Sequence, residues 1–235
     1  MNNTTSKASY KNQRKAEKQK QQQKMKNLTW ITVSGLVVLL ILAFVFIPKP
    51  APAAFAYDKL PILGSPDAPV KVVEFGDYKC PSCQFFSQQI EPQIKKDFVD
   101  KGGVSFYFMN FTFIGPDSYT AALAAQSIYH QNNDAYWKFY DALYKNQQNE
   151  KLQWATPEFL VNLAKQQNLP IDFNKLQQDI VSRTYAAEVD EHNAMAKKLN
   201  VTGTPTLFIN GEKMEEAMDY AKVKAAIEKA QKGAK

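Results

Sequence analysis

Cysteine and histidine are scarce in this chain, which has two of each among its 235 residues. Two cysteines are too few for the dense set of bridges that holds small secreted domains together. A structural zinc site needs about four soft ligands, and two thiols with only His130 and His192 in addition fall short of that set. The scarcity leaves Cys80 and Cys83 as an isolated pair whose spacing has to indicate its role.

Excess positive charge is absent outside the N-terminus. The chain carries a net charge of +6, but residues 1–27 hold eight basic side chains against a single acid, Glu17, which leaves the other 208 residues at −1. A nucleic-acid-binding domain would carry its basic residues as a patch on its folded part. The distribution therefore predicts no nucleic-acid partner and a separate basic tail over residues 1–27.

Charged residues are missing altogether from residues 28–47. Twenty apolar residues in a helix, at about 1.5 Å each, span the roughly 30 Å hydrocarbon core of a bilayer. We expect a single-pass transmembrane anchor or uncleaved signal in the cell membrane, with the basic tail cytoplasmic and the rest of the chain extracytoplasmic. A cleaved signal peptide is the alternative because Ala54-Phe55-Ala56 fits an Ala-x-Ala site, although the apolar run exceeds the usual signal core.

The remaining chain divides into a linker and one domain. Residues 48–57 are rich in proline and alanine, which predicts a semi-rigid, extended spacer, and residues 58–235 are long enough for one domain with a substantial core. Apolar and β-branched residues over 70–75 and 104–114 predict two strands, the second buried on both faces and parallel to the first. Between them, helical periodicity to about Asp100, with a kink at Pro92, predicts a strand–helix–strand unit.

Helical periodicity covers residues 116–199 and predicts about four helices, with Thr156 capping the helix that begins at Pro157. The aromatic residues of this block could form a ligand platform, but their helical spacing favours a core role. They include Tyr136, Trp137, Phe139, Tyr140 and Tyr144. Residues 206–211 then predict a strand ending in an Asn-Gly turn, followed by a return strand over 212–214 and a final helix from about Asp219.

The cysteines lie in Cys80-Pro81-Ser82-Cys83, where a strand gives way to a helix. The first N–H groups of a helix are unpaired and carry the positive end of its dipole, so the pKa of a thiol placed there falls. Cys80 is predicted to be the exposed, reactive thiol and Cys83 the buried, resolving one, with Pro81 suited to the first helical turn. A disulfide across two residues closes too small a loop to stabilise the fold, which favours a redox pair over a structural staple or a metal site.

Together these motifs resemble the DsbA-like thiol:disulfide oxidoreductases, most closely the membrane-anchored Gram-positive BdbD type. The resemblance covers about residues 60–233 and rests on residues 64–78 leading into the two cysteines, on Val201-Thr-Gly-Thr-Pro205 and on the helical block between them. It implies an α/β thioredoxin fold with the helical domain inserted at about 116–199. It also implies that the Thr204–Pro205 bond is cis, faces the dithiol and pairs with an extended substrate segment.

Glu74 matches the buried acid that this family has near its active site, which implies a role in relaying the proton of Cys83. The alternative is an outward-facing carboxylate, because side chains alternate between the two faces of a strand. Ser82 departs from the enterobacterial branch of the family, which has histidine at this position. The missing cationic neighbour leaves the oxidising strength of the pair open.

A weaker motif is the acidic run that holds Glu188, Asp190 and Glu191. Glu188 and Glu191 share a helix face, and no Lys or Arg lies three or four residues from either. Carboxylates of this kind could hold a calcium ion. A solvated acidic face is the alternative.

The resemblance implies an extracytoplasmic enzyme that introduces disulfide bonds into secreted or surface proteins with free thiols. It needs no organic cofactor beyond the Cys80–Cys83 disulfide, and we expect a monomer. Reoxidation implies a DsbB-like, quinone-linked membrane partner. The alternatives are a reductase or isomerase with the same residues, a thiol metal chaperone, and a non-catalytic client-binding module.

Overall fold

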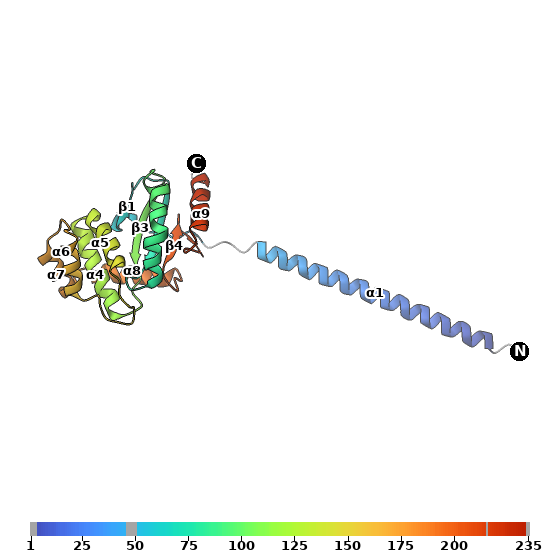
Figure 1. The fold of residues 1–235 in the computed structure, drawn as a ribbon. Coiled ribbons are helices and arrows are strands. Elements are labelled where there is room, and N and C mark those ends of the chain that lie inside the picture. The colour runs from blue at the N-terminus through green and yellow to red at the C-terminus, as the bar shows by residue number, and fades with distance from the viewer. Residues whose placement is uncertain (1–3, 46–50, 215, 234–235) are drawn as a thin grey trace. The chain divides into compact units, whose positions relative to one another are not determined.

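The computed structural model describes residues 4–45, 51–214 and 216–233. The chain divides into two units, residues 1–51 and 52–235. In the first unit, residues Thr4–Val45 form one helix, α1 (Figure 1). Within the described residues, no helix has both the length and the apolar character needed to cross a membrane. The predicted segment 28–47 ends in residues 46 and 47, which lie outside the described residues.

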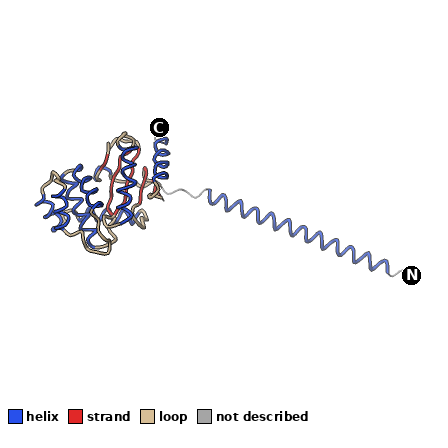
Figure 2. Tube along the Cα trace, viewed as in Figure 1, coloured by secondary structure: helices blue, strands red, loops and turns tan. Residues whose placement is uncertain are grey.

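The second unit is built on a five-stranded sheet in the order β1-β3-β2-β4-β5. Figure 2 shows the strands together, with helices around them. The strands are β1 (Ile62–Leu63), β2 (Val70–Gly76), β3 (Val104–Asn110), β4 (Thr206–Ile209) and β5 (Glu212–Met214). Strands β2 and β3 are parallel, and the other neighbours are antiparallel. The parallel pair and the full burial of β3 confirm the prediction, whereas the short strand β1 was not predicted.

Side chains of β2 alternate between the two faces of the sheet, and each face has its own core. Val70 and Val72 pack with the helix that carries the cysteines. Val73 and Phe75 pack on the opposite face. Glu74 has the parity of Val70 and Val72, so it belongs to the face that the cysteine-bearing helix covers.

Helical residues continue from 81 to 99 along that face. They form α2 (Pro81–Phe85), a π-helical segment η2 (Phe86–Ile90), α3 (Glu91–Ile94) and a second π-helical segment η3 (Lys95–Val99). The π-helical segments lie on either side of the predicted kink at Pro92, which cannot donate a backbone hydrogen bond. Helix α9 (Tyr220–Gly233) buries Val223 and Ile227 in the same core.

The insertion between β3 and β4 contains five helices rather than about four. They are α4 (Pro116–Gln131), α5 (Asn133–Lys145), α6 (Pro157–Gln166), α7 (Phe173–Ser182) and α8 (Ala186–Lys198). Helices α4 to α7 lie together at one side of the sheet in Figure 1. Helix α7 ends where Arg183 takes a left-handed conformation with φ of 56°, a break that apolar periodicity does not reveal. Thr156 caps α6 as predicted, by accepting a hydrogen bond from the Phe159 N–H.

The aromatic residues of α5 form core, as predicted. Tyr136, Phe139, Tyr140 and Tyr144 are at most 1% exposed. Tyr136, Tyr140 and Tyr144 are spaced by four residues and therefore share one face of α5. Helix α5 contacts the cysteine-bearing helix, and this face forms the wall behind Cys83.

The predicted spacer 48–57 is shorter than expected, because its second half packs on the domain. The Phe55 ring lies with its centroid 5.5 Å from that of Phe208 and 6.1 Å from that of Phe75. The Ala53 N–H donates a hydrogen bond of 2.8 Å to the Gly211 carbonyl. A side chain on Gly211 would meet the Ala53 backbone at 2.4 Å, and the φ of this glycine is +82°. The apolar ring of Phe55 thus holds the N-terminal segment to the sheet.

This packing predicts that Phe55→Ala lowers the free energy of unfolding by roughly 1–2 kcal/mol, less than the loss of a fully buried phenylalanine. Urea unfolding followed by circular dichroism measures the change. Leu152→Ala is the matched control, since Leu152 is 57% exposed and its loss should change the free energy by no more than about 0.5 kcal/mol. Equal effects from the two variants would show that the segment does not contribute to the fold.

Candidate active site

The two cysteines lie at the junction of β2 and α2. Cys80 is the N-cap residue of α2, and Pro81 occupies the first helical position, as predicted. Cys83 is fully buried, but Cys80 is only 7% exposed rather than open to solvent. The prediction of an exposed Cys80 is corrected because the loop that precedes β4 covers it. Both cysteines are unpaired thiols in this structure.

The covering loop contains Thr204 and Pro205, and the peptide bond between them is cis. The Cys80 Sγ lies 3.3 Å from the Thr204 carbonyl oxygen, to which the thiol donates a hydrogen bond. The loop implied by the resemblance therefore lies against the dithiol, although 124 positions separate the two residues in the chain.

The pKa values of the two thiols shift in opposite directions. The pKa of Cys80 is lowered to about 6, first by a hydrogen bond from the Cys83 thiol and then by the Thr204 side chain and the backbone N–H groups of Cys83 and Ser82. Burial is the main reason that the pKa of Cys83 is raised well above its usual value, and the charge of Glu74 adds to it. At neutral pH Cys80 is a thiolate and Cys83 a thiol.

Glu74 lies inside the protein, so the outward-facing alternative is excluded. It is 0% exposed. Its Oε2 accepts a hydrogen bond of 2.9 Å from the Tyr140 hydroxyl, while its Oε1 has no hydrogen-bond partner among the described residues. Burial is the main cause that raises the pKa of Glu74 well above its usual value, and the charges of Glu91 and Cys80 add to it. A buried acid of this kind holds a proton close to Cys83.

Asp77 holds the backbone on both sides of the active-site loop. Its Oδ1 accepts a 2.9 Å hydrogen bond from the Lys79 N–H, and its Oδ2 accepts from the N–H groups of Phe113 and Ile114 at 3.0 and 3.2 Å. The sequence analysis did not identify this residue. The signal available was an aspartate between a strand and the cysteines, where short polar side chains often bind turn N–H groups.

Two further contacts tie this loop to the helical insertion. The Lys79 ammonium lies 2.5 Å from Oδ1 of Asp117 in α4, and both side chains are buried. The other Asp117 oxygen accepts hydrogen bonds from the backbone N–H groups of Trp154 and Ala155. Pairs of this kind join residues more than thirty positions apart, so local patterns cannot reveal them.

Gln147 holds the same loop through its carbonyl groups. Its Nε2 donates hydrogen bonds of 2.9 Å to the Tyr78 carbonyl and 3.0 Å to the Cys80 carbonyl. Ser82, by contrast, is exposed. The lowered pKa of Cys80 depends on the backbone N–H of Ser82 and not on a cationic side chain at that position.

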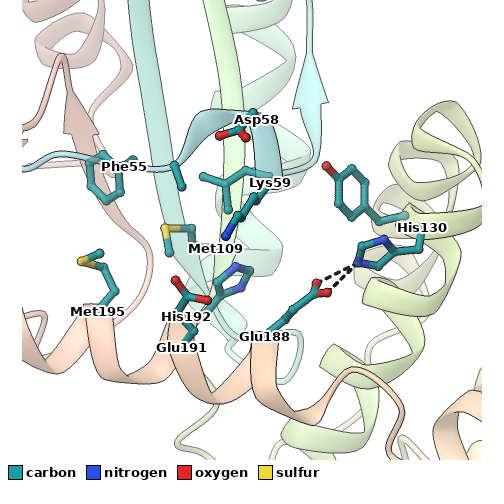
Figure 3. Close-up of a pocket in the computed structure, with 12 residues that line it drawn as sticks. Phe55, Asp58, Lys59, Met109, His130, Glu188, Glu191, His192 and Met195 are labelled. Atoms are coloured by element: carbon teal, nitrogen blue, oxygen red, sulfur yellow. Dashed lines mark hydrogen bonds and ion pairs between the residues drawn. The ribbon is translucent and has the colours of Figure 1, made fainter.

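Two of the three acidic residues proposed for calcium have partners within the protein. Glu188 accepts hydrogen bonds from Gln126 at 2.7 Å and from His130 at 2.8 Å, and Asp190 accepts one from Tyr119. Figure 3 shows Glu188 joined to His130 by dashed lines, beside a cavity that Glu191 and His192 also line. No group of three or more His, Cys, Asp or Glu side chains among the described residues is placed to hold a metal ion. Glu188 and Asp190 are thus engaged within the protein, and both partners of Glu188 come from α4.

The hydrogen bond between the thiols predicts that Cys83→Ala raises the pKa of Cys80 from about 6 by at least about one pH unit, because the largest stabilising contact of the thiolate is lost. The ultraviolet absorbance of the thiolate, followed against pH in reduced protein, measures this pKa. Ser82→Ala keeps the backbone N–H groups and should leave the pKa in place. An unchanged pKa in Cys83→Ala would show that the helix terminus alone stabilises the thiolate.

Comparison with known proteins identifies the family. The family model for thioredoxin matches residues 58–229. Disulfide bond formation protein D of Bacillus subtilis (strain 168) is 41% identical over 173 residues, which cover 74% of this chain and 78% of that protein. The probable disulfide bond formation protein D of Bacillus anthracis is 41% identical over 175 residues, which cover 74% of this chain and 80% of that protein.

Solved structures agree with the sequence comparison. The crystal structure of oxidised BdbD from Bacillus subtilis superposes with a TM-score of 0.74 at 38% identity, covering 79% of this chain and 100% of the other. The structure of Chlamydia trachomatis DsbA superposes with a TM-score of 0.68 at 26% identity, covering 79% and 97%. The chain belongs to the thioredoxin family, and it is a DsbA-like protein thiol:disulfide oxidoreductase that forms disulfide bonds.

Proposed function

We propose that this protein oxidises paired thiols of secreted or surface proteins on the outer side of the cell membrane, with Cys80 as the attacked sulfur. The observation that carries the proposal is the opposite shift of the two thiol pKa values, which lowers that of Cys80 to about 6 and raises that of Cys83. A substrate thiolate attacks Cys80 in the Cys80–Cys83 disulfide, the S–S bond breaks, and Cys83 leaves and takes up a proton. A second substrate thiolate then attacks the substrate sulfur of the mixed disulfide and releases Cys80 as a thiolate. Two electrons pass to the enzyme.

The stabilised thiolate sets the direction of this exchange. Whatever stabilises the reduced form makes the disulfide a stronger oxidant. The hydrogen bond from the Cys83 thiol and the backbone N–H groups of Cys83 and Ser82 supply this stabilisation, so a cationic residue in place of Ser82 is not required. This supports an oxidase over a reductase with the same residues.

Glu74 is proposed to exchange a proton with Cys83 in each cycle. Support comes from its complete burial and from the way its charge raises the pKa of Cys83, which couples the protonation of the two groups. The backbone around Thr204 and Pro205, beside Cys80, is proposed to pair with an extended substrate segment.

Residues 28–47 are proposed to anchor the protein, with the basic tail in the cytoplasm. The proposal is supported by twenty residues without a charge after eight basic side chains. Since each cycle leaves the cysteines reduced, the enzyme needs an oxidant. We propose a DsbB-like, quinone-linked membrane partner for this step.

An oxidase mechanism predicts that Cys80→Ala abolishes the oxidation of a reduced two-cysteine substrate, because the attacked sulfur is lost. Cys83→Ala should also fail to oxidise this substrate, because a lone Cys80 cannot form the disulfide that the substrate thiolate attacks. Mass spectrometry and free-thiol titration measure both outcomes, with Ser82→Ala as the active control. Full function of Cys80→Ala in delivering folded clients would favour a binding module, and tight Cu(I) binding without oxidation would favour a metal chaperone.

The thiolate also predicts how stability depends on pH. The pKa of Cys80 is lowered from 9.0 to about 6 in the folded, reduced protein. The stabilisation is therefore fully present above about pH 9 and is lost as the pH falls through about 6. Between these values the free energy of unfolding of the reduced form should rise relative to the oxidised form by up to about 1.4 kcal/mol per pH unit.

Urea unfolding of the reduced and oxidised forms at several pH values measures this difference. Groups that titrate alike in both forms contribute equally to the two free energies of unfolding, so their contributions cancel in the difference. Reduced Cys80→Ala should not show the rise. A difference between the two wild-type forms that does not depend on pH would show that Cys80 is not a stabilised thiolate.

A further inference from the structure

A cavity of about 470 Å³ lies on the face of the sheet opposite to the cysteine-bearing helix. Met109 of β3 lines it, and this residue is aligned with Phe75 of β2 in the core of that opposite face. The other lining residues come from α4, from α8 and from the segment before β1 (Figure 3). The volume is in the range of pockets that hold small organic molecules, and both cysteines lie outside the described lining.

The lining of this cavity combines an apolar surface with a few polar groups. Apolar and aromatic side chains make up much of it, and they include Phe55, Leu60, Met109, Tyr129 and Met195. Methionine side chains are flexible and polarizable, so two of them on one wall can adapt to ligands of different shape. The surface therefore suits a molecule with an apolar body.

His192 of α8 places a hydrogen-bond donor in this cavity. The residue is 5% exposed. Its Nδ1 accepts a hydrogen bond of 3.3 Å from the Asn110 backbone N–H and lies 3.2 Å from the Asn110 side-chain nitrogen. Since a backbone N–H faces Nδ1, that atom carries no proton, and Nε2 carries it instead. Burial also lowers the pKa of His192 to about 4, so the ring is uncharged at neutral pH.

The Nε2–H group of His192 is available to a ligand. No described residue accepts a hydrogen bond from it, and Nε2 is not among the side-chain atoms that are closed off without a partner. The atom is therefore reached from the cavity that His192 lines. A protonated nitrogen has no free lone pair for a metal ion, so the ligand must offer an acceptor atom.

The charged side chains of the lining disfavour an anionic ligand. Glu188 and Glu191 of α8 and Asp58 of the N-terminal segment contribute carboxylates, whereas Lys59 contributes an ammonium group. An additional negative charge would be repelled by more groups than attract it. An uncharged acceptor, such as a carbonyl oxygen, avoids this repulsion and the cost of burying a charge.

We propose that this cavity binds a small, uncharged, apolar molecule whose carbonyl oxygen accepts a hydrogen bond from His192 Nε2. The apolar part of the molecule lies against Phe55, Met109 and Met195. The ligand thus contacts the N-terminal segment, the sheet and α8 together. This binding site is additional to the dithiol and does not rest on the proposed function.

Acetophenone and α-methylstyrene are suitable probes, because they have nearly the same shape and differ in a C=O group against a C=CH2 group. Isothermal titration calorimetry on the full-length, reduced protein measures both affinities. Acetophenone should bind about two to ten times more tightly, the effect of one hydrogen bond between uncharged groups. It should also shift the nitrogen-15 NMR signal of His192 Nε2, which is assigned by its loss in His192→Phe.

Three variants locate the binding site. Met195→Trp places a larger side chain at the wall of the cavity and should abolish the binding of both probes. Met218→Trp makes the same change at a residue that is 40% exposed and outside the described lining, so both affinities should stay unchanged. His192→Phe keeps a ring of similar size without the N–H donor and should bind the two probes about equally.

Three results would overturn the proposal. The first is no binding of acetophenone at about 10 mM, well above the concentration at which a pocket of this kind should fill. The second is equal affinity of the wild-type protein for both probes, which would exclude the hydrogen bond from His192. The third is unchanged binding in Met195→Trp, which would place the probe elsewhere. None of these measurements depends on disulfide exchange, so they leave the proposed function to its own tests.

Discussion

The hydrogen bond from the Cys83 thiol to Cys80 is the interaction on which the chemistry of this protein depends. It makes the two sulfurs unequal, since the donor keeps its proton and the acceptor becomes a thiolate. It can form because Cys83 lies one helical turn from Cys80 and is closed off from water by α5. Burial of one thiol thus lowers the pKa of the other.

The difference between the pKa values of the two thiols requires a rigid loop around Cys80. Asp77 fixes this loop from the sheet side, while Asp117 and Gln147 fix it from the helical insertion. The cis Thr204–Pro205 segment covers the remaining side of the sulfur. Cys80 therefore lies among three parts of the chain that are distant in sequence, and its low exposure of 7% follows from this enclosure.

Much of the fold and the centre of the site could be predicted from the sequence. The parallel β2–β3 pair follows from two apolar runs separated by a helical stretch, and the position of Cys80 at a helix start follows from Pro81. The residues that were missed act over long sequence distances. Tyr140 was correctly assigned to the core, but helical periodicity gives no sign that its hydroxyl binds Glu74. Glu188 was judged by neighbours on its own helix, whereas His130, its partner, comes from α4.

The buried Lys79–Asp117 pair gives the helical insertion a direct mechanical connection to the reactive sulfur. Lys79 immediately precedes Cys80, and the Asp117 carboxylate also binds the backbone that leads into α6. Neither charge can exchange its partner for water without exposing the interior, so the pair cannot stretch gradually. A displacement of the insertion against the sheet would be transmitted to the Cys80 backbone. The position of the Cys80 thiol would then depend on the helical insertion, although the insertion contributes no atom to the exchange.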